Sequence, residues 1–285
     1  MEQLERCVVN YGTSQSEKIM ATDELHSDGH ATEENDRQFV TALARGLEIL
    51  ACFKTDDRYL SNQEIAQRTH LARPTVSRLT YTLMKTDYLL RNGNSGEYRL
   101  GPKVLQLGFS TLAATNVAER FSDLMNDLCR GPNGHITVAL AERSGTRAVY
   151  LAVHRSRQAV TLSIDVGARL PLFYSGIGRA ILAGISEEER AMVLKKAIDE
   201  FPGQRERLEK SLDEAVSDYA KYGYCTSFGS WKPEINAIAA PIRSLDGTVI
   251  YGVNVGGPSF LVSPEELHEE YGDRLRQAVN ALGEP

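Results

Sequence analysis

One segment of the chain combines cationic and hydroxyl side chains with a complete lack of carboxylates. Between Arg73 and Lys85 there is no Asp or Glu. Guanidinium groups can donate paired hydrogen bonds to guanine, hydroxyls can bond to bases or phosphates, and carboxylates would repel phosphates. This chemistry suits contact with duplex nucleic acid. The side chains that carry it are Arg73, Thr75, Ser77, Arg78, Tyr81 and Lys85.

Apolar spacing predicts that this segment is a helix with one buried face. Val76, Leu79, Leu83 and Met84 recur at helical intervals, which turns the polar side chains outward or to the flanks. Pro74 fits the first position of such a helix, where its missing N–H costs nothing. The alternative is an ordinary solvated helix face that binds nothing.

The elements around this helix predict a winged helix-turn-helix. An apolar stripe formed by Phe39, Ala42, Leu43, Leu47, Leu50 and Phe53 predicts a first helix. Ser61 and Glu64 have capping-box spacing and predict the start of a second helix, which ends near Thr69. Strand-like runs at 88–91 and 97–100 flank a turn-rich loop. Arg91 borders this hairpin, where it could reach a DNA backbone or minor groove; alternatively, the hairpin only covers the helices.

Charge is distributed in blocks along the chain, although the net charge of the 285 residues is only -6. Residues 37–103 carry 11 basic and 6 acidic side chains, which predicts a polyanionic partner. Residues 1–36 carry 2 basic and 9 acidic side chains and read as a disordered acidic extension. The alternative for the basic block is chance drift in composition.

Beyond Gly134, β-branched runs separated by turn signals predict an α+β domain on an antiparallel sheet. The expected strands are 136–141, 148–153, 160–164, 235–242 and 249–255. The expected helices are 178–183, 187–197, 206–222 and 264–282, preceded by a linker helix at 102–116 and a helix at 117–129.

Several functional classes find no support in the sequence. No stretch of about 18 apolar residues could span a membrane, and the first twenty residues do not resemble a secretory signal, so the cytoplasm is the expected compartment. Cys7, Cys52, Cys129 and Cys225 lie too far apart for a zinc motif, and no catalytic constellation is visible. We therefore expect no metal, cofactor or enzymatic activity. The alternative is a small-molecule enzyme, or a redox sensor using a thiol such as Cys225, whose winged helix binds proteins.

The chain resembles the IclR family of bacterial transcriptional regulators over most of residues 39–283. The segments that carry the resemblance are Leu43–Leu50, Glu64–Ala66, Leu71–Leu79, Tyr98–Gly101, Leu170–Leu172 with Gly178–Ala183, and Gly223–Tyr224 with Ala237–Ile242. The resemblance implies a winged helix-turn-helix at 37–101 that binds double-stranded operator DNA. It also implies a linker helix at 102–116 and a GAF-like effector-binding domain at 117–285. Such proteins are typically homodimers or homotetramers, and a two-fold dimer would read a palindromic operator.

Departures from the family pattern predict the kind of effector. Asn254 and Gly256 replace serines of relatives that bind small keto acids, and Ala237 stands where those relatives often carry Cys. Aromatic and apolar side chains, among them Phe228, enrich the surrounding segments. We therefore expect an aromatic or similarly bulky organic acid, its carboxylate bound by backbone N–H groups near Gly178. The alternative is that these residues only fill the core or an interface. The predicted effector-binding residues are Phe173, Tyr174, Ser175, Ile177, Gly178, Cys225, Ser227, Trp231, Ala237, Asn254 and Gly256.

Overall fold

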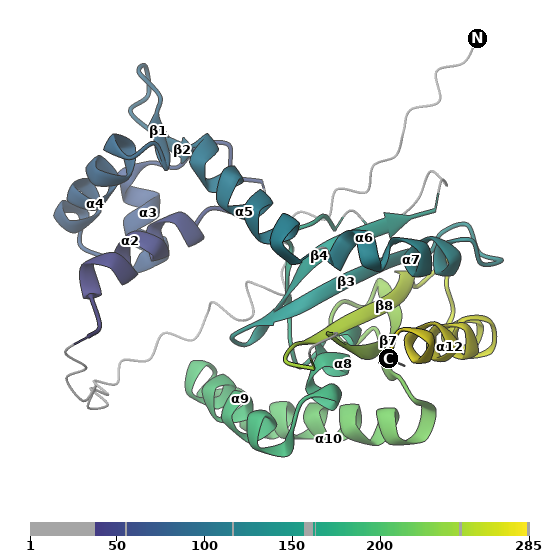
Figure 1. Cartoon of the computed structure of the whole chain (residues 1–285). Helices are drawn as coiled ribbons and strands as arrows, with labels where there is room; N and C mark the ends of the chain where they lie inside the picture. Colours follow the sequence, from purple (N-terminus) through teal and green to yellow (C-terminus); the bar gives the residue numbers. More distant parts are fainter. Residues whose placement is uncertain are drawn as a thin grey trace, which may run out of the picture. The chain divides into compact units, whose positions relative to one another are not determined.

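The computed structural model describes residues 38–54, 56–115, 117–156, 162, 164–244 and 247–283. These residues form two compact units, one ending at Thr115 and one beginning at residue 117 (Figure 1). The predicted acidic extension, residues 1–36, lies outside the described residues. No described helix is both long enough and apolar enough to cross a membrane.

The first unit is a winged helix-turn-helix, as the sequence predicts. Its core contains Ile49, Ile65, Val76, Leu89 and Tyr98, one each from α2, α3, α4, β1 and β2, together with Leu60. Ser61 and Glu64 form the predicted capping box, with each side chain bonding the other's backbone N–H. The elements are α2 (Thr41–Ala51), α3 (Asn62–Thr69), α4 (Arg73–Lys85), β1 (Leu89–Arg91), β2 (Tyr98–Leu100) and α5 (Pro102–Thr115).

Two tight turns of this unit use left-handed backbone at residues other than glycine. His70 joins α3 to α4 with φ 52°, and Asp87 follows α4 with φ 61°. Asp and His tolerate this region better than most side chains. Asp87 thus allows the chain to turn sharply after α4.

The apolar stripe that predicted the first helix divides between core and solvent, because Leu50 and Phe53 pack against the core of this unit. Ile49, outside the predicted stripe, is fully buried. Phe39, Leu43 and Leu47 are 57–62% exposed. Periodicity shows only that these side chains share a face. The tertiary structure decides that Ile49, Leu50 and Phe53 pack on the core, whereas Leu43 and Leu47 do not.

The second unit contains a six-stranded antiparallel sheet in the order β5-β4-β3-β8-β7-β6. Its long central strands are β3 (Thr137–Ser144), β4 (Arg147–Arg155), β7 (Ile235–Arg243) and β8 (Ile250–Pro258), and its edges are β5 (Arg169–Pro171) and β6 (Cys225–Phe228). The helices are α6 (Val117–Arg120), α7 (Ser122–Cys129), α8 (Gly176–Gly184), α9 (Glu187–Glu200), α10 (Arg205–Tyr222), α11 (Pro264–Glu266) and α12 (Gly272–Gly283).

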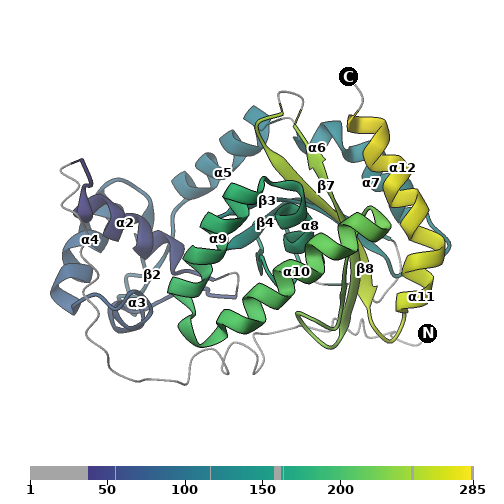
Figure 2. The ribbon, with the colours of Figure 1, turned by 90° about the horizontal axis from the view of Figure 1, so that it is seen from below.

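Helices cover both faces of this sheet (Figures 1 and 2). On the α12 face, side chains such as Val138 and Val253 pack with Phe121 of the α6–α7 junction and Leu275 of α12. On the α8 face, side chains such as Ala139 pack with residues of α8, α9 and α10. Strand residues alternate between the two clusters, as the two-residue period of β-structure requires.

The second unit corrects four details of the sequence prediction. Residues 162 and 164 are not in a strand, and the rest of the expected strand 160–164 lies outside the described residues. The short strands β5 and β6 were not predicted. The helix expected at 117–129 is interrupted at Phe121, which is fully buried. The helix expected at 264–282 contains a π-helical turn, Leu267–Tyr271, between α11 and α12.

Candidate nucleic-acid interface and effector site

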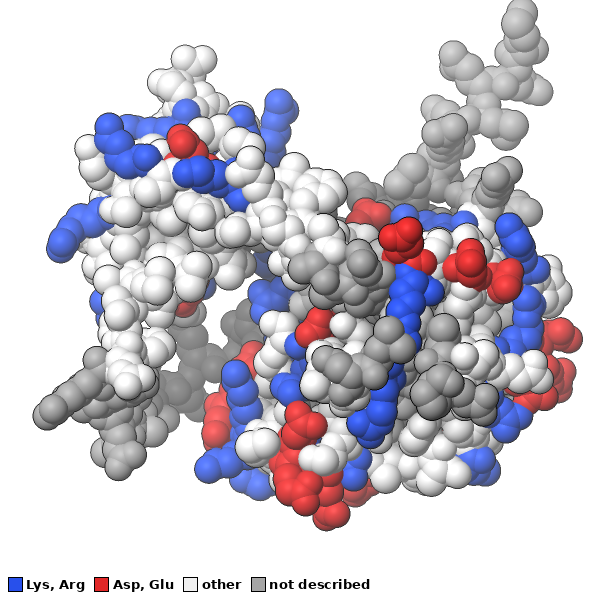
Figure 3. Space-filling model, in the orientation of Figure 1, with Lys and Arg blue, Asp and Glu red and all other residues white. Residues whose placement is uncertain are grey.

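The outward face of α4 carries the side chains predicted to contact DNA. Arg73, Ser77, Arg78, Tyr81 and Lys85 are exposed, and Thr75 is half-buried. Tyr81 is 57% exposed, and its ring lies 5.5 Å from the Lys85 ammonium, a cation–π distance. Basic side chains predominate on the side of this unit seen in Figure 3. The core-facing side holds Val76 and also Thr80, whose buried hydroxyl donates to the Val76 carbonyl.

Asn62 is a residue of this region that the sequence analysis missed. It lies at the start of α3, and its Nδ2 donates to the Ser77 Oγ over 3.0 Å. The bond joins the two helices of the helix-turn-helix and leaves the Ser77 hydroxyl hydrogen free to be donated. Asn62 therefore orients a predicted contact residue.

Arg91 lies at the base of the hairpin, where the sequence placed it. Its side chain is exposed, and Nε donates to the Gly96 carbonyl across the loop over 3.2 Å. The guanidinium is thus held against the wing, with further N–H groups available to a phosphate.

The loop before α8 brings several predicted effector residues together. Ser175 caps α8, because its Oγ accepts from the Gly178 N–H over 3.2 Å. Ser227 on β6 donates to the Tyr174 carbonyl over 2.9 Å and thereby ties the loop to the sheet. A side chain at Gly176 would lie 3.5 Å from Ser227 and from Ala237 on β7.

The backbone donors at the start of α8 differ in availability. The Gly178 N–H donates to the Ser175 hydroxyl, so it is not available to a carboxylate. None of the hydrogen bonds within the described residues uses the N–H of Gly176 or of Ile177. A helix N-terminus with free N–H groups favours an anion.

Gly178 has a packing role instead. A Cβ at this position would lie 2.2 Å from the Leu172 carbonyl oxygen and 2.6 Å from its Cα. Only glycine allows α8 to approach the preceding loop so closely.

Asn254 and Gly256 of β8 lie on the α8 face of the sheet. Ala237 of β7 lies on the same face, next to Gly176 at the start of α8. Asn254 is opposite Ala139 of β3 and Ala239 of β7, and Gly256 is opposite Thr137 and Ala237. This arrangement brings the predicted β8 residues to the same layer as the start of α8.

The aromatic residues of this region differ in position. The Tyr174 hydroxyl donates to Gln204 over 3.0 Å, and its ring lies 4.3 Å from the Arg207 guanidinium. Phe173 is buried and Trp231 half-buried in the α8-face cluster. Phe228 lies on the opposite α12 face, where it meets His268 edge to face.

Cys225 is buried among small side chains of α8, α10 and β7. Its thiol donates to the Ala215 carbonyl over 3.2 Å, and burial raises the pKa of the Cys225 thiol. A protonated, shielded thiol is a poor nucleophile, which disfavours the redox-sensor alternative. No cluster of three or more His, Cys, Asp or Glu suited to a metal occurs among the described residues.

Arg179 of α8 organises the α8 face, and the sequence analysis did not single it out. It is buried, and it donates to the Phe173 and Thr226 carbonyls, to Ser211 and to Glu214. One guanidinium therefore joins the loop before α8, helix α10 and strand β6. These partners come from distant segments of the chain, so the sequence alone could not identify the role of Arg179.

Tyr150 on β4 is a third residue that the sequence analysis missed. Burial raises the pKa of its hydroxyl, while a hydrogen bond with the Asn254 side chain opposes this rise. Tyr150 packs in the α8-face cluster, so it links Asn254 to the strand beyond β3.

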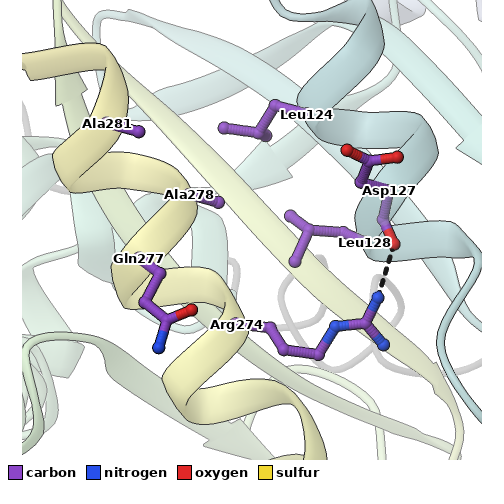
Figure 4. Close-up of a pocket in the computed structure, with 7 residues that line it drawn as sticks. All are labelled: Leu124, Asp127, Leu128, Arg274, Gln277, Ala278 and Ala281. Carbon is purple, nitrogen blue, oxygen red and sulfur yellow. Dashed lines mark hydrogen bonds between the residues drawn. The ribbon is translucent and has the colours of Figure 1, made fainter.

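An open groove of about 420 Å³ lies on the other face of the sheet, between α7 and α12 (Figure 4). Its apolar lining comes from Leu124, Leu128, Ala278 and Ala281. Arg274 crosses one end and donates to the Asp127 carbonyl over 2.7 Å. None of the predicted effector residues lines this groove.

Two family models match the chain. The model described as the bacterial transcriptional regulator IclR C-terminal domain matches residues 109–283, and the IclR helix-turn-helix model matches residues 42–93. The HTH-type transcriptional regulator TsaQ1/TsaQ2 of Comamonas testosteroni is 28% identical over 252 residues, which cover 88% of this chain and 90% of that protein. The Pca regulon regulatory protein of Pseudomonas putida is 28% identical, with coverage of 83% and 80%.

Solved structures show the same similarity. An IclR family transcriptional regulator from Brucella abortus is 39% identical, with a TM-score of 0.79 and coverage of 89% of this chain and 95% of that one. An IclR homolog from Microbacterium hydrocarbonoxydans, crystallised in complex with 4-hydroxybenzoate, is 25% identical, with a TM-score of 0.64 and coverage of 85% and 97%.

Proposed function

The chain belongs to the IclR family of bacterial transcriptional regulators, and we propose that it binds a palindromic operator through α4. We further propose that an aromatic acid changes its affinity for this operator. Family membership makes it a ligand-responsive, DNA-binding regulator of catabolic or metabolic operons. Our proposal goes beyond family membership in naming the DNA-contact residues, the class of effector and the oligomeric assembly. Since its target is the bacterial chromosome, we place the protein in the cytoplasm.

The exposed face of α4 carries the proposal for DNA. It presents Arg73, Arg78 and Lys85 to solvent, and the helix has no acidic residue. A helix of this kind can enter the major groove, where arginine reads guanine with two hydrogen bonds. Arg91 on the hairpin supports contact with the adjacent backbone.

The proposal predicts strongly salt-dependent binding to DNA from the protein's own promoter region. Each phosphate neutralised by Arg or Lys releases counterions, so the affinity should fall steeply between about 50 and 200 mM salt. Fluorescence anisotropy with a labelled promoter fragment measures this slope. A flat response, or no binding at any salt concentration, would favour a protein-interaction role for the winged helix.

Two features support an aromatic acid as the effector. The α8 face combines buried aromatic side chains with free N–H groups at the start of α8, a mixture that suits an apolar ring bearing a carboxylate. The Microbacterium relative was crystallised with 4-hydroxybenzoate. Effector binding would change the relative free energies of assemblies that place two α4 helices differently; a coupling of about 1 to 3 kcal/mol suffices for a 5- to 150-fold change in operator affinity.

The unit that contains α4 also supports association into a dimer or tetramer. Phe39, Leu43 and Leu47 form an exposed apolar stripe along α2, and Leu105 and Phe109 of α5 are more than 60% exposed. Contiguous exposed apolar side chains mark association surfaces. A dimer would also supply the second recognition helix that a palindrome requires.

Replacing Leu43 and Leu47 together with Glu is expected to shift the protein toward monomer and to weaken operator binding at the same time. The two carboxylates would be buried at the subunit contact, whereas they stay solvated in the monomer. Light scattering coupled to size exclusion measures the mass. The matched control is Met192→Glu on α9, another exposed apolar side chain, which should change neither property. An unchanged mass for the double variant would exclude the α2 stripe from the interface.

A further inference from the structure

Two buried polar atoms on the α8 face have no hydrogen-bond partner among the described residues. They are Oγ1 of Thr137 and Oδ1 of Asn254. The two residues are only 2% and 6% exposed, respectively. Buried polar groups in folded proteins are nearly always hydrogen-bonded. These two atoms therefore require a partner that the described chain does not provide.

The strand register makes the two residues neighbours. Thr137 is opposite Gly256, and Asn254 is opposite Ala139, so Thr137 and Asn254 are diagonal partners on adjacent strands. Val138 of β3 and Val253 of β8 pack on the α12 face. By alternation, Thr137 and Asn254 face α8.

The start of α8 lies over the same part of the sheet. A Cβ at Gly252, two residues before Asn254, would lie 2.7 Å from the Ile177 carbonyl oxygen. Gly176 packs toward Ala237, which is opposite Gly256. The unpaired atoms of the sheet and the free N–H groups of α8 therefore share one layer.

The chemistry of the two atoms selects their partner. An amide oxygen only accepts, whereas a threonine hydroxyl can donate or accept. A single hydroxyl group on a ligand satisfies both, since it can donate to Asn254 and accept from Thr137. A carboxylate cannot donate to the Asn254 oxygen, so it belongs at the α8 N–H groups instead.

We propose that Thr137 and Asn254 are specificity-determining residues that bind a hydroxyl group of the effector, which makes the effector a hydroxylated aromatic acid. This inference rests on the proposed aromatic-acid response. Thr137 lies outside every segment that the sequence analysis assigned to the effector.

Calorimetric titration of the full chain with benzoate, 3-hydroxybenzoate and 4-hydroxybenzoate tests the inference. At least one hydroxybenzoate should bind about tenfold or more tightly than benzoate, because the analogue without the hydroxyl leaves both buried atoms unpaired. Equal or tighter binding of benzoate overturns the inference but leaves the aromatic-acid response standing. Failure of all three ligands, with salt-dependent DNA binding intact, overturns both the inference and the proposed effector class, while the DNA-binding role survives.

The variant Thr137→Val gives a second readout that does not depend on a ligand. Valine has nearly the same shape, so removing an unpaired hydroxyl should leave the melting temperature unchanged or raise it, and should abolish the preference for hydroxybenzoate. The matched control is Thr146→Val, because the buried Thr146 hydroxyl donates to Glu200 over 2.5 Å. That variant should melt at a lower temperature and keep the preference. If Thr137→Val destabilises the protein as much as Thr146→Val, the Thr137 hydroxyl has an internal partner and the inference is wrong.

Discussion

Replacement of Arg78 by Ala is expected to cost about 1 to 3 kcal/mol of specific operator binding, which weakens the affinity by a factor of about 5 to 150. Arg78 is exposed in the middle of α4, on a helix that carries no acidic residue. Its guanidinium is the group on this face best suited to a bidentate contact with guanine. Anisotropy titrations with the operator and with a scrambled duplex measure the loss.

The same titrations separate base reading from phosphate binding. If Arg78 reads a base, the loss of affinity should be confined to the operator. The variant should also lose its preference for one particular base pair of that operator. If it holds a phosphate, both duplexes should lose affinity alike and the salt dependence should become shallower by about one ion. The control is Arg130→Ala, which removes an exposed arginine from the end of α7 and should change neither titration. An Arg78→Ala protein with native affinity for both duplexes would exclude α4 as the recognition helix.

Replacement of Gly178 by Ala is expected to destabilise the second unit by about 3 kcal/mol or more. The added Cβ would lie 2.2 to 2.7 Å from three backbone atoms of Leu172, none of which can rotate away as a side-chain tip can. Relief requires moving α8 away from the loop, which disturbs the Ser175 cap and the Arg179 hydrogen bonds at the same time. Urea unfolding followed by circular dichroism measures the change.

Gly176→Ala is the matched control, two residues earlier in the same helix. A Cβ there would meet its nearest neighbours at 3.5 to 3.6 Å, which is ordinary contact. Alanine also favours the helix more than glycine does. We expect a stability within about 0.5 kcal/mol of the native protein. Equal effects of the two substitutions would contradict the close approach of α8 to Leu172.

The winged helix could be predicted from sequence because its signals are local. The capping box of Ser61 and Glu64 acts over three residues, and the left-handed turn at Asp87 depends on its own backbone. The exposed face of α4 follows from the helical period alone. Local hydrogen bonds and helix geometry are fixed by residues a few positions apart, so they can be read without the rest of the fold.

The effector layer could be predicted only in part, because its contacts join residues far apart in the chain. Sequence placed Asn254, Ala237 and the start of α8 near one site. It could not show that Phe228 turns to the opposite face of the sheet, or that the Gly178 N–H is already used by Ser175. A side chain's face depends on strand register, and a one-residue change of register reverses it.

The sequence by itself thus determined the family, the winged helix and the cationic surface of α4. Only the tertiary structure decided that Leu43 and Leu47 of α2 lie exposed, that Arg179 joins three elements, and that side-chain oxygens of Thr137 and Asn254 remain unpaired beside α8. The reason is physical: burial and hydrogen-bond satisfaction are properties of an environment assembled from distant segments. The propensity and the charge of a helix face belong to the segment itself.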